Sequence, residues 1–308
     1  GDVSIPNQLT RLKDIQMTIE VTADNSTLIQ SQVANLLVQP LLQESTFLAA
    51  GPTILDSSSP VRVPRIATAA TVGFVAEGTQ ISENSDVAFD EVTLLPSTLK
   101  GLKVLVKLSN ELIRTSVVGL EAVLRTRLVT DVARALDAAM WDGAGTSNTI
   151  KGILRQSSIG TGTLDLTDPD SLIDGMATAQ ANKVSPSHWV MTSDSFAALR
   201  KLKIAKAGTL SDQDFRQYLF DPSTIQNGTS FQLFGLPVII TDNIPKVSTK
   251  ARVALVDFSK VVVARDLNAE VKILDQTFGD YDSIGIRVVS RWDTNLLQPK
   301  AVTLLTEA

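Results

Sequence analysis

The stretch from Gly119 to Gly145 constrains the fold of this chain more than any other part of the sequence. Apolar residues recur there every three or four positions, which is the spacing of an amphipathic helix. We predict one helix over residues 119–141, roughly 35 Å long at about 1.5 Å per residue. Gly143 is expected to end it in left-handed backbone, as glycine commonly does at helix C-termini. The stripe to be buried consists of Leu120, Val123, Leu124, Leu128, Val132, Ala135, Leu136, Ala139 and Met140.

The polar face of this helix carries two pairs of oppositely charged residues. Glu121 and Arg125 are four positions apart, and so are Arg127 and Asp131. Residues at this spacing are neighbours on a helix surface, so both pairs predict ion pairs. A helix this long, with one apolar side, supports something larger than itself.

The composition narrows the chemistry open to the chain. Its 308 residues can bury a sizeable core, and we expect two domains. It contains no cysteine and a single histidine, His188. The lack of cysteine excludes disulfides, thiolate metal sites and a cysteine nucleophile, and zinc sites and catalytic triads depend mostly on histidine. We therefore expect no metal, no cofactor and no enzymatic activity.

The charge pattern and the termini add further expectations. A net charge of −5 without a basic block is a poor match for a protein that grips nucleic acid. No apolar run approaches the ~18 residues of a membrane-spanning helix, and no secretory signal is visible, so we expect no membrane association. The first residue is Gly1, which fits either cleavage of a longer precursor or removal of an initiator methionine.

The first hundred residues predict two extensions. Residues 1–26 are polar and read as an arm, followed by a helical stripe over 27–44 that Pro40 should interrupt. From 61 to 108 the apolar period changes to two, which is typical of strands. Because 77–91 is acidic and polar, we predict a long hairpin with a negatively charged tip. An isolated hairpin is marginally stable in water, so it should lie on the rest of the chain or on a neighbour.

Residues 150–280 read as an α+β unit. We predict two helices in it, the first capped by Thr167 or Asp168 and the second by Ser193 or Asp194. Strands are expected at 188–191, 231–234, 238–241, 252–256, 261–264, 271–274, 284–291 and 302–305.

One set of residues invites an enzymatic interpretation. His188 lies close in sequence to Ser193 and Asp194, and a hydrolase uses these three residue types together. The histidine follows Pro186 at the start of a predicted strand, and no second histidine supports it. We therefore favour a structural histidine.

Two further motifs have a plain interpretation. Gly143 and Gly145 suggest a phosphate-binding loop, but they follow a helix instead of opening one, so we predict a helix end and a turn. Asp275, Asp280 and Asp282 suggest a cation site, but the run lacks the loop pattern and the closing glutamate of a calcium loop. We predict a solvated turn.

A set of short segments, taken in order, resembles the major capsid proteins of tailed bacteriophages. Their capsid fold is shared with encapsulins and with the shell floors of herpesviruses. The resemblance covers roughly residues 27–305, and the ordered set is more specific than any single piece. The segments are Val61–Arg65, Gly73–Gly78, Phe89–Leu94, Lys107–Leu112, Val129–Trp141, Asp142–Thr146, Lys151–Leu154, Leu233–Val238 and Val256–Ser259.

The resemblance implies an α+β capsid fold with named parts. Residues 1–60 would form an N-terminal arm with a short helix, and 61–100 an extended loop built as a β-hairpin. Residues 101–154 would form the peripheral domain, with the long helix as its spine packed on a sheet. Residues 155–280 would form the axial domain, and 281–308 would return as C-terminal strands.

The resemblance also implies a function. Copies would assemble into hexamers and pentamers of an icosahedral shell that encloses double-stranded DNA, bound non-specifically. The subunit would belong to the virion, assembled in the host cytoplasm, with a portal, a maturation protease and in some relatives a cement protein as partners. An encapsulin-type nanocompartment stays open as an alternative, as does, from a different class, the soluble hydrolase.

Assembly contacts are expected on the extensions and on the spine helix. The acidic hairpin tip needs basic partners, which charge places on the spine of a neighbour, and the polar loop 204–229 would point toward the symmetry axis. The expected contact residues are Phe74, Glu77, Glu83, Arg125, Arg127, Arg134, Tyr218 and Phe220.

Some relatives join their subunits by a Lys–Asn isopeptide bond that a glutamate promotes. This sequence departs from that pattern, because its hairpin has no lysine between Val61 and Leu99. Asp282 stands at the position of the asparagine, and Val289 at that of the glutamate. We therefore predict a shell held without covalent crosslinks.

Overall fold

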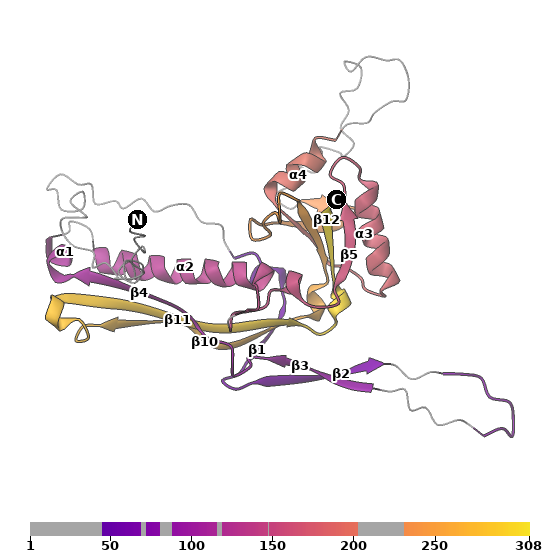
Figure 1. Cartoon of the computed structure of the whole chain (residues 1–308), viewed down its shortest axis with the longest axis horizontal. Coiled ribbons are helices and arrows are strands. Elements are labelled where there is room, and N and C mark those ends of the chain that lie inside the picture. The colour runs from indigo at the N-terminus through magenta and orange to yellow at the C-terminus, as the bar shows by residue number, and fades with distance from the viewer. Residues whose placement is uncertain (1–44, 69–71, 81–87, 116–118, 147, 203–230) are drawn as a thin grey trace, which may run out of the picture. The chain divides into compact units, whose positions relative to one another are not determined.

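A computed structural model describes residues 45–68, 72–80, 88–115, 119–146, 148–202 and 231–308 (Figure 1). The predicted helix over 27–44 and the predicted loop at 204–229 lie outside the described residues. The chain divides into two compact units. The smaller unit includes residues 102–132 and 269–290, and the larger unit includes the described residues up to 101, residues 133–268 and residues 291–308.

The smaller unit is a helix packed on strands. Strand β4 (Leu102–Ser109) pairs antiparallel with the first part of β11 (Ser283–Leu296), and Val106 lies opposite Ile286. Helix α1 (Asn110–Thr115) follows β4, and Ser109 caps it as its hydroxyl accepts the N–H of Glu111 at 3.2 Å. Helix α2 (Leu120–Asp142) is the predicted long helix, and its first part, up to Val132, belongs to the smaller unit. Its core comprises Leu108, Leu112, Leu120, Leu128, Val132, Ile286 and Val288.

Both predicted ion pairs form on α2. The guanidinium of Arg125 lies 2.8 Å from the carboxylate of Glu121, and that of Arg127 lies 2.9 Å from Asp131. Most of the predicted apolar stripe is buried or half-buried, but Ala135, which was expected to be buried, is exposed.

The end of α2 differs from the prediction in the backbone conformation of Gly143. Gly143 follows the last helical residue, but its backbone is not left-handed; Gly145, with φ of 68°, holds that conformation. A Cβ at Gly143 would lie 2.4 Å from the carbonyl oxygens of both Ala139 and Ile150. Glycine is required there because two backbones approach closely, and Gly152 donates its N–H to the Gly143 carbonyl at 3.0 Å.

The larger unit contains a six-stranded sheet in the order β5-β12-β9-β6-β8-β7. Figure 1 shows α3 (Asp170–Ala181) and α4 (Ser193–Arg200) beside it. The sheet consists of β5 (Gly160–Leu164), β6 (His188–Met191), β7 (Gln232–Leu233), β8 (Leu236–Ile240), β9 (Arg252–Val256) and β12 (Val302–Glu307). The short 3-10 helices of the described chain are Leu48–Ala50, Ile153–Arg155, Phe258–Lys260, Gly279–Tyr281 and Pro299–Ala301.

The helix starts of this unit correct one prediction. Pro169 stands directly before the first residue of α3 and makes no side-chain cap hydrogen bond. The Asp168 carboxylate accepts the backbone N–H of Asp170 at 3.0 Å and so takes part of the predicted capping role. Helix α4 is capped by Thr192, whose hydroxyl accepts from the N–H of Ser195, and not by Ser193 or Asp194.

The strand predictions also need one correction. The two strands predicted at 261–264 and 271–274 are one continuous strand, β10 (Val261–Leu274). The residues between them, 265–270, are half-buried or exposed positions within it. Strand β1 (Thr53–Asp56) pairs with its first residues in parallel.

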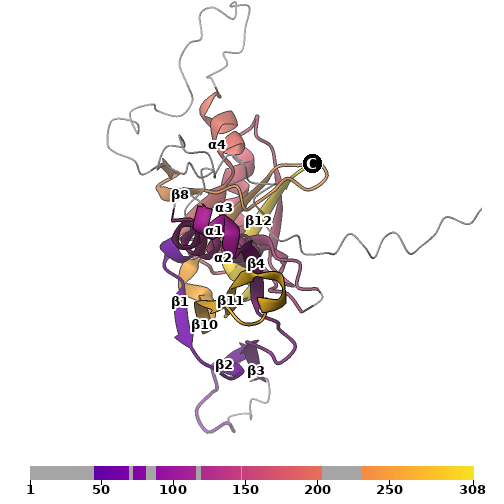
Figure 2. The same ribbon diagram turned by 90° about the vertical axis from the view of Figure 1, so that its left-hand side faces the viewer.

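A hairpin is present, but its second strand differs from the prediction. Strands β2 (Val61–Thr68) and β3 (Ala88–Leu94) pair antiparallel, with Val63 opposite Val92 and an irregularity between Ile66 and Thr68. Residues 88–91, which were predicted within the tip, belong to β3, and residues 102–108 pair with β11 instead of forming the second arm. Figures 1 and 2 show it projecting from the rest of the larger unit.

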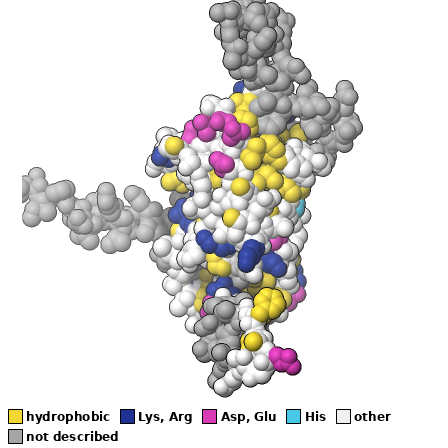
Figure 3. Space-filling model, turned by 90° about the vertical axis from the view of Figure 1, so that its right-hand side faces the viewer, with side chains coloured by type: hydrophobic (Ala, Val, Ile, Leu, Met, Phe, Trp, Pro, Cys, Tyr) yellow, Lys and Arg dark blue, Asp and Glu magenta, His cyan; other side chains and the backbone are white. Residues whose placement is uncertain are grey.

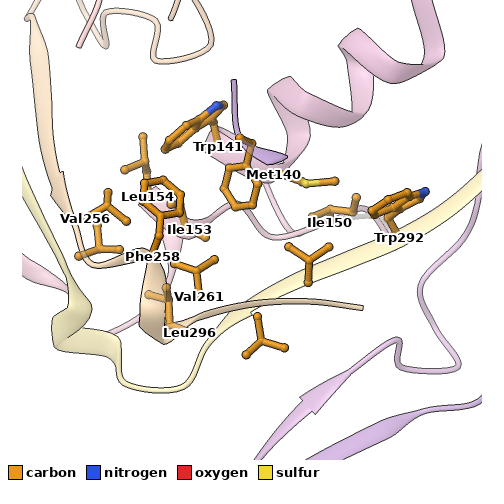
Figure 4. Close-up of a cluster of buried hydrophobic side chains, with 14 of the residues drawn as sticks. Met140, Trp141, Ile150, Ile153, Leu154, Val256, Phe258, Val261, Trp292 and Leu296 are labelled. Carbon is orange, nitrogen blue, oxygen red and sulfur yellow. The ribbon is translucent and has the colours of Figure 1, made fainter. Parts of the chain in front are cut away.

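Aromatic side chains take part in the buried hydrophobic cluster of the larger unit, of which Figure 4 labels Trp141, Phe258 and Trp292. The rings of Phe47, Trp141 and Phe258 meet edge to face, with centroids 4.9–6.0 Å apart. Trp189 and Trp292 are buried as well, so all three tryptophans are core residues. Because Phe47 belongs to this cluster, the segment that follows the N-terminal residues is fixed to α2.

No helix among the described residues is long and apolar enough to cross a membrane.

Candidate assembly interface

The outer face of the hairpin carries uncovered apolar side chains. Strand alternation places Ile66 and Phe89 opposite each other on this face, and they are 65% and 76% exposed. Further along, Val72 and Phe74 are 91% and 112% exposed. Figure 3 shows hydrophobic side chains on this lower part of the molecule next to acidic ones. Uncovered apolar residues grouped in this way mark an interaction surface.

Most of the described charges on the hairpin are paired within it. Arg65 donates from Nε to Asp90 at 3.1 Å, and Arg62 lies 3.5 Å from Glu91. The hydrogen bond from Arg65, together with the backbone N–H of Glu91, holds the pKa of Asp90 below its ordinary value. Glu77 is exposed and has no ion-pair partner among the described residues. Glu83 lies outside them.

The arginines of α2 are not equally available. Arg125 and Arg127 are paired with acids of their own helix. Arg134 is exposed and has no ion-pair partner in the described part of the chain. Of the three arginines expected to contact the acidic hairpin tip of a neighbour, Arg134 is therefore the one best placed to form a new ion pair. Tyr218 and Phe220 lie outside the described residues.

Strand β11 holds the base of the hairpin where β3 ends. Side chains two residues apart lie on the same face of a strand, and three of them contact residues 93–96. Asn295 donates from Nδ2 to the carbonyl of Thr93 at 3.1 Å, and Asp293 accepts the N–H of Leu95 at 2.8 Å. Arg291 donates to the carbonyl of Pro96 at 3.4 Å and to Asp266 at 2.9 Å.

Leu95 adopts an unusual backbone conformation at this base. Its φ is 52°, in the left-handed region, which costs a residue other than glycine roughly 1 kcal/mol. Its side chain is 1% exposed within the core of the larger unit. The carboxylate of Asp293 is also buried, and that burial raises its pKa although the N–H groups of Leu95 and Thr294 oppose the shift.

A second buried aspartate holds the start of the described chain. Asp137 of α2 accepts from the hydroxyl of Ser45 at 2.8 Å and from the N–H of Phe47 at 2.9 Å. The side-chain amide of Asn243 donates to the same carboxylate at 2.7 Å. These bonds fix the root of the N-terminal arm to the helix.

A third aspartate joins the end of α2 to the sheet. Asp142 forms a two-point pair with Arg252, at 3.1 and 2.7 Å, and a second pair with Arg155 at 3.0 Å. Burial by itself would raise the pKa of Asp142, but the hydrogen bonds from the two arginines outweigh it and hold that pKa below its ordinary value. Arg252 also donates to the carbonyl of Pro245.

The geometry opposes the hydrolase interpretation. His188 begins β6 and Ser193 begins the helix that follows its other end, so four residues of mostly extended chain lie between them. At about 3.3 Å per strand residue, that distance is far beyond hydrogen-bond reach. The Nδ1 atom of His188 instead meets the hydroxyl of Ser187 at 2.9 Å, and burial lowers the pKa of the imidazole.

The acidic turn gives no sign of a cation site. No group of three or more metal-ligating side chains comes together within the described ranges. Asp282, in left-handed backbone with φ of 45°, accepts from the side-chain amide of Asn110 at 2.7 Å.

A shallow polar hollow of about 400 Å³ lies beside β1 and β10. Two ion pairs reach its walls, Asp56 with Arg265 and Asp266 with Arg291. Because its charged groups are already neutralised, we assign no reaction to it.

Comparison with solved structures defines the class of protein. The chain shares its fold with the subunit of a structure described as the capsid of a native GTA particle, with a TM-score of 0.72 and 21% identity over 94% of this chain and 98% of that one. A chain from Mycobacterium phage Bobi gives 0.68 and 17%, over 94% and 98%. One from Microbacterium phage Oxtober96 gives 0.67 and 18%, over 94% and 99%. The fold is thus that of capsid subunits.

The family follows from the sequence. The model of the phage capsid family matches residues 25–306, so the chain belongs to this family. The comparison with curated proteins gave no match. The protein is a structural capsid protein of the virion shell, and the resemblance seen in its short segments is confirmed.

Proposed function

We propose that copies of this chain assemble into hexamers and pentamers of an icosahedral shell that encloses double-stranded DNA. The observation that carries the proposal is the hairpin, which projects from its unit and exposes Ile66, Phe89, Val72 and Phe74. Such a surface is costly for an isolated subunit and is stabilised when a second copy covers it. The shell is therefore built by laying the hairpin of one copy on another.

The parts of the subunit divide the work. Residues 1–60 form the arm, 61–100 the extended loop, 101–154 the peripheral domain, 155–280 the axial domain and 281–308 the returning strands. Several contacts per subunit bury a few thousand Å² in total, well beyond the ~800 Å² of a chance packing contact. Because each subunit makes these contacts with several neighbours at once, individually weak contacts hold firmly.

In this assembly the apolar hairpin face provides most of the buried contact area, and the charged residues fix how one copy is aligned on the next. Phe74 packs on the neighbour, and Glu77 and Glu83 approach its Arg134. Arg125 and Arg127 contribute less than their charges suggest, because they are already paired with Glu121 and Asp131. Tyr218 and Phe220 meet their copies around the axis.

The shell is held without covalent crosslinks. The hairpin has no lysine. Asp282 stands where an isopeptide bond needs an asparagine, and its carboxylate accepts a hydrogen bond from Asn110. Val289 offers no carboxylate to promote such a reaction. The subunit acts without enzymatic activity, assembles in the host cytoplasm, and meets a portal and a maturation protease as its partners, with DNA bound non-specifically; a cement protein is a partner in some relatives only.

Negative-stain electron microscopy of the purified chain tests the proposal. We expect closed shells with hexameric and pentameric units, and intact particles that run as monomers on denaturing gels. Small cages loaded with an enzyme would favour the encapsulin-type alternative, and small oligomers without any shell would refute the proposal. A ladder of covalent multimers would overturn the non-covalent part alone.

A further inference from the structure

We infer that Arg291, Asp293 and Asn295 of β11 act as a clasp that sets the direction in which the extended hairpin leaves the subunit. The inference rests on the proposed function, because it concerns the hairpin through which the copies join. The clasp residues are positioning residues, since none of them lies on the exposed hairpin face. Their effect on assembly is exerted through the chain segment 93–96.

The spacing of the three residues is the first argument. They stand at alternate positions of one strand, so their side chains lie on one face of it, and each contacts a different backbone group of the segment. The contacts are Asn295 to the Thr93 carbonyl at 3.1 Å, Asp293 to the Leu95 N–H at 2.8 Å and Arg291 to the Pro96 carbonyl at 3.4 Å. Backbone contacts constrain the path of the chain whatever its side chains are.

The backbone conformation of Leu95 is a second observation that supports the clasp. A leucine at φ of 52° persists only where its surroundings over-determine the conformation. The surroundings here are the buried carboxylate on its N–H and the core around its side chain, which is 1% exposed. This residue turns the chain directly after β3 ends at Leu94, so its conformation decides where the hairpin points.

Two further contacts hold the side chains of Arg291 and Asp293 in place. Arg291 pairs with Asp266 of β10 at 2.9 Å, and Asp293 accepts the N–H of Thr294 at 2.9 Å. These side chains are thereby held before the segment contacts them. Because these side chains are already ordered, they lose little conformational freedom when a neighbouring copy packs against the hairpin.

A distance measurement on the whole chain tests the clasp. The chain contains no cysteine, so spin labels can be placed at two introduced cysteines without background. Ala88 on the hairpin and Ser185 in the body of the larger unit are both exposed and suit this purpose. In the unassembled subunit we expect one narrow distance distribution, and we expect Asp293→Ala and Asn295→Ala to broaden it.

Matched variants separate positioning from stability. Asn268→Ala replaces an exposed asparagine of β10 whose side chain makes no hydrogen bond among the described residues, and it should leave the distance unchanged. Asp293→Asn keeps one acceptor oxygen for the Leu95 N–H and should restore a narrower distribution than Asp293→Ala. Asn295→Ala serves if Asp293→Ala does not fold, and its thermal midpoint should stay near that of Asn268→Ala.

Two outcomes would overturn the clasp. One is a distribution that stays as narrow in the Asp293→Ala, Asn295→Ala double variant as in the parent. The other is that this double variant forms shells as regular as those of the parent when both are viewed by electron microscopy. A parent chain that makes no shells would refute the proposed function instead, and the distance measurement would then still decide whether the clasp positions the hairpin.

Discussion

The buried pair between Asp142 and Arg252 gives the sharpest test of how this subunit is held together. The side chains of both residues are almost fully enclosed, at 7% and 5% exposure, and they share two hydrogen bonds. Asp142→Ala leaves the guanidinium buried without its carboxylate. Breaking a buried pair from one side typically costs about 3–5 kcal/mol, and we expect the lower part of this range because Arg252 keeps its bonds to Pro245.

Removing both charges should cost less than removing one. In the double variant Asp142→Leu, Arg252→Met no charge remains uncompensated, and apolar replacements of buried pairs are often close to neutral. Arg155 loses a partner in either case, but its side chain is 48% exposed and stays hydrated. The double variant should therefore be more stable than Asp142→Ala.

The pH dependence of the same pair has a definite sign. The pKa of Asp142 is lower in the folded chain than in the unfolded one, so its contribution is fully present above the unfolded value. That contribution is lost as the pH falls through the folded pKa. The difference in unfolding free energy between the parent and Asp142→Ala should thus be constant above about pH 5 and shrink in more acidic solution.

Urea denaturation of unassembled subunits, followed by circular dichroism, measures these differences. The midpoint should fall while the slope stays constant, which identifies a change in stability and not in the unfolded state. A loss below about 1 kcal/mol would be typical of an exposed salt bridge. Such a value, or a double variant less stable than Asp142→Ala, would refute the reasoning.

Three further predictions follow from single contacts. Asp137→Ala should cost about 1–3 kcal/mol, since it leaves the buried Phe47 N–H without an acceptor, and limited proteolysis should then cut the arm root near Ser45 faster than in the parent. Gly143→Ala should cost about 1–3 kcal/mol in urea denaturation, because its Cβ would clash with two carbonyl oxygens. Burial raises the pKa of Asp293, so the folded chain binds that proton more tightly than the unfolded chain, and stability should decline as the pH rises between the two pKa values. A pH titration of the unfolding free energy in which Asp293→Asn shows the same decline would contradict this assignment.

Local patterns carried much of the fold. The three- and four-residue spacing of apolar residues located α2, and the alternation after residue 61 located the hairpin. The ion pairs of Glu121 and Arg127 with their partners followed from spacing alone, because both partners lie on one helix. Where the prediction erred, as at the cap of α4, the competing residue was a neighbour with equally suitable chemistry.

The aspartates that hold the subunit together were not visible in the sequence. Asp137 and Asp142 stand among apolar helical residues like ordinary polar ones, and Asp293 lies within a strand. Their partners are 90 to 198 residues away for the contacts with Phe47, Arg252 and Leu95. No periodicity links residues so far apart, so neither burial nor pairing could be inferred from it.

The sequence by itself determined the periodic elements, the lack of cysteine chemistry and the membership of a capsid family, because these depend on the order of residues along the chain. The tertiary structure alone decided which charges remain available for a neighbour and which are spent inside the subunit. It also decided why Gly143 is a glycine, namely a close approach of two backbones and not a left-handed turn. The physical reason is that burial and pairing are properties of contacts between distant residues, which only folding brings together.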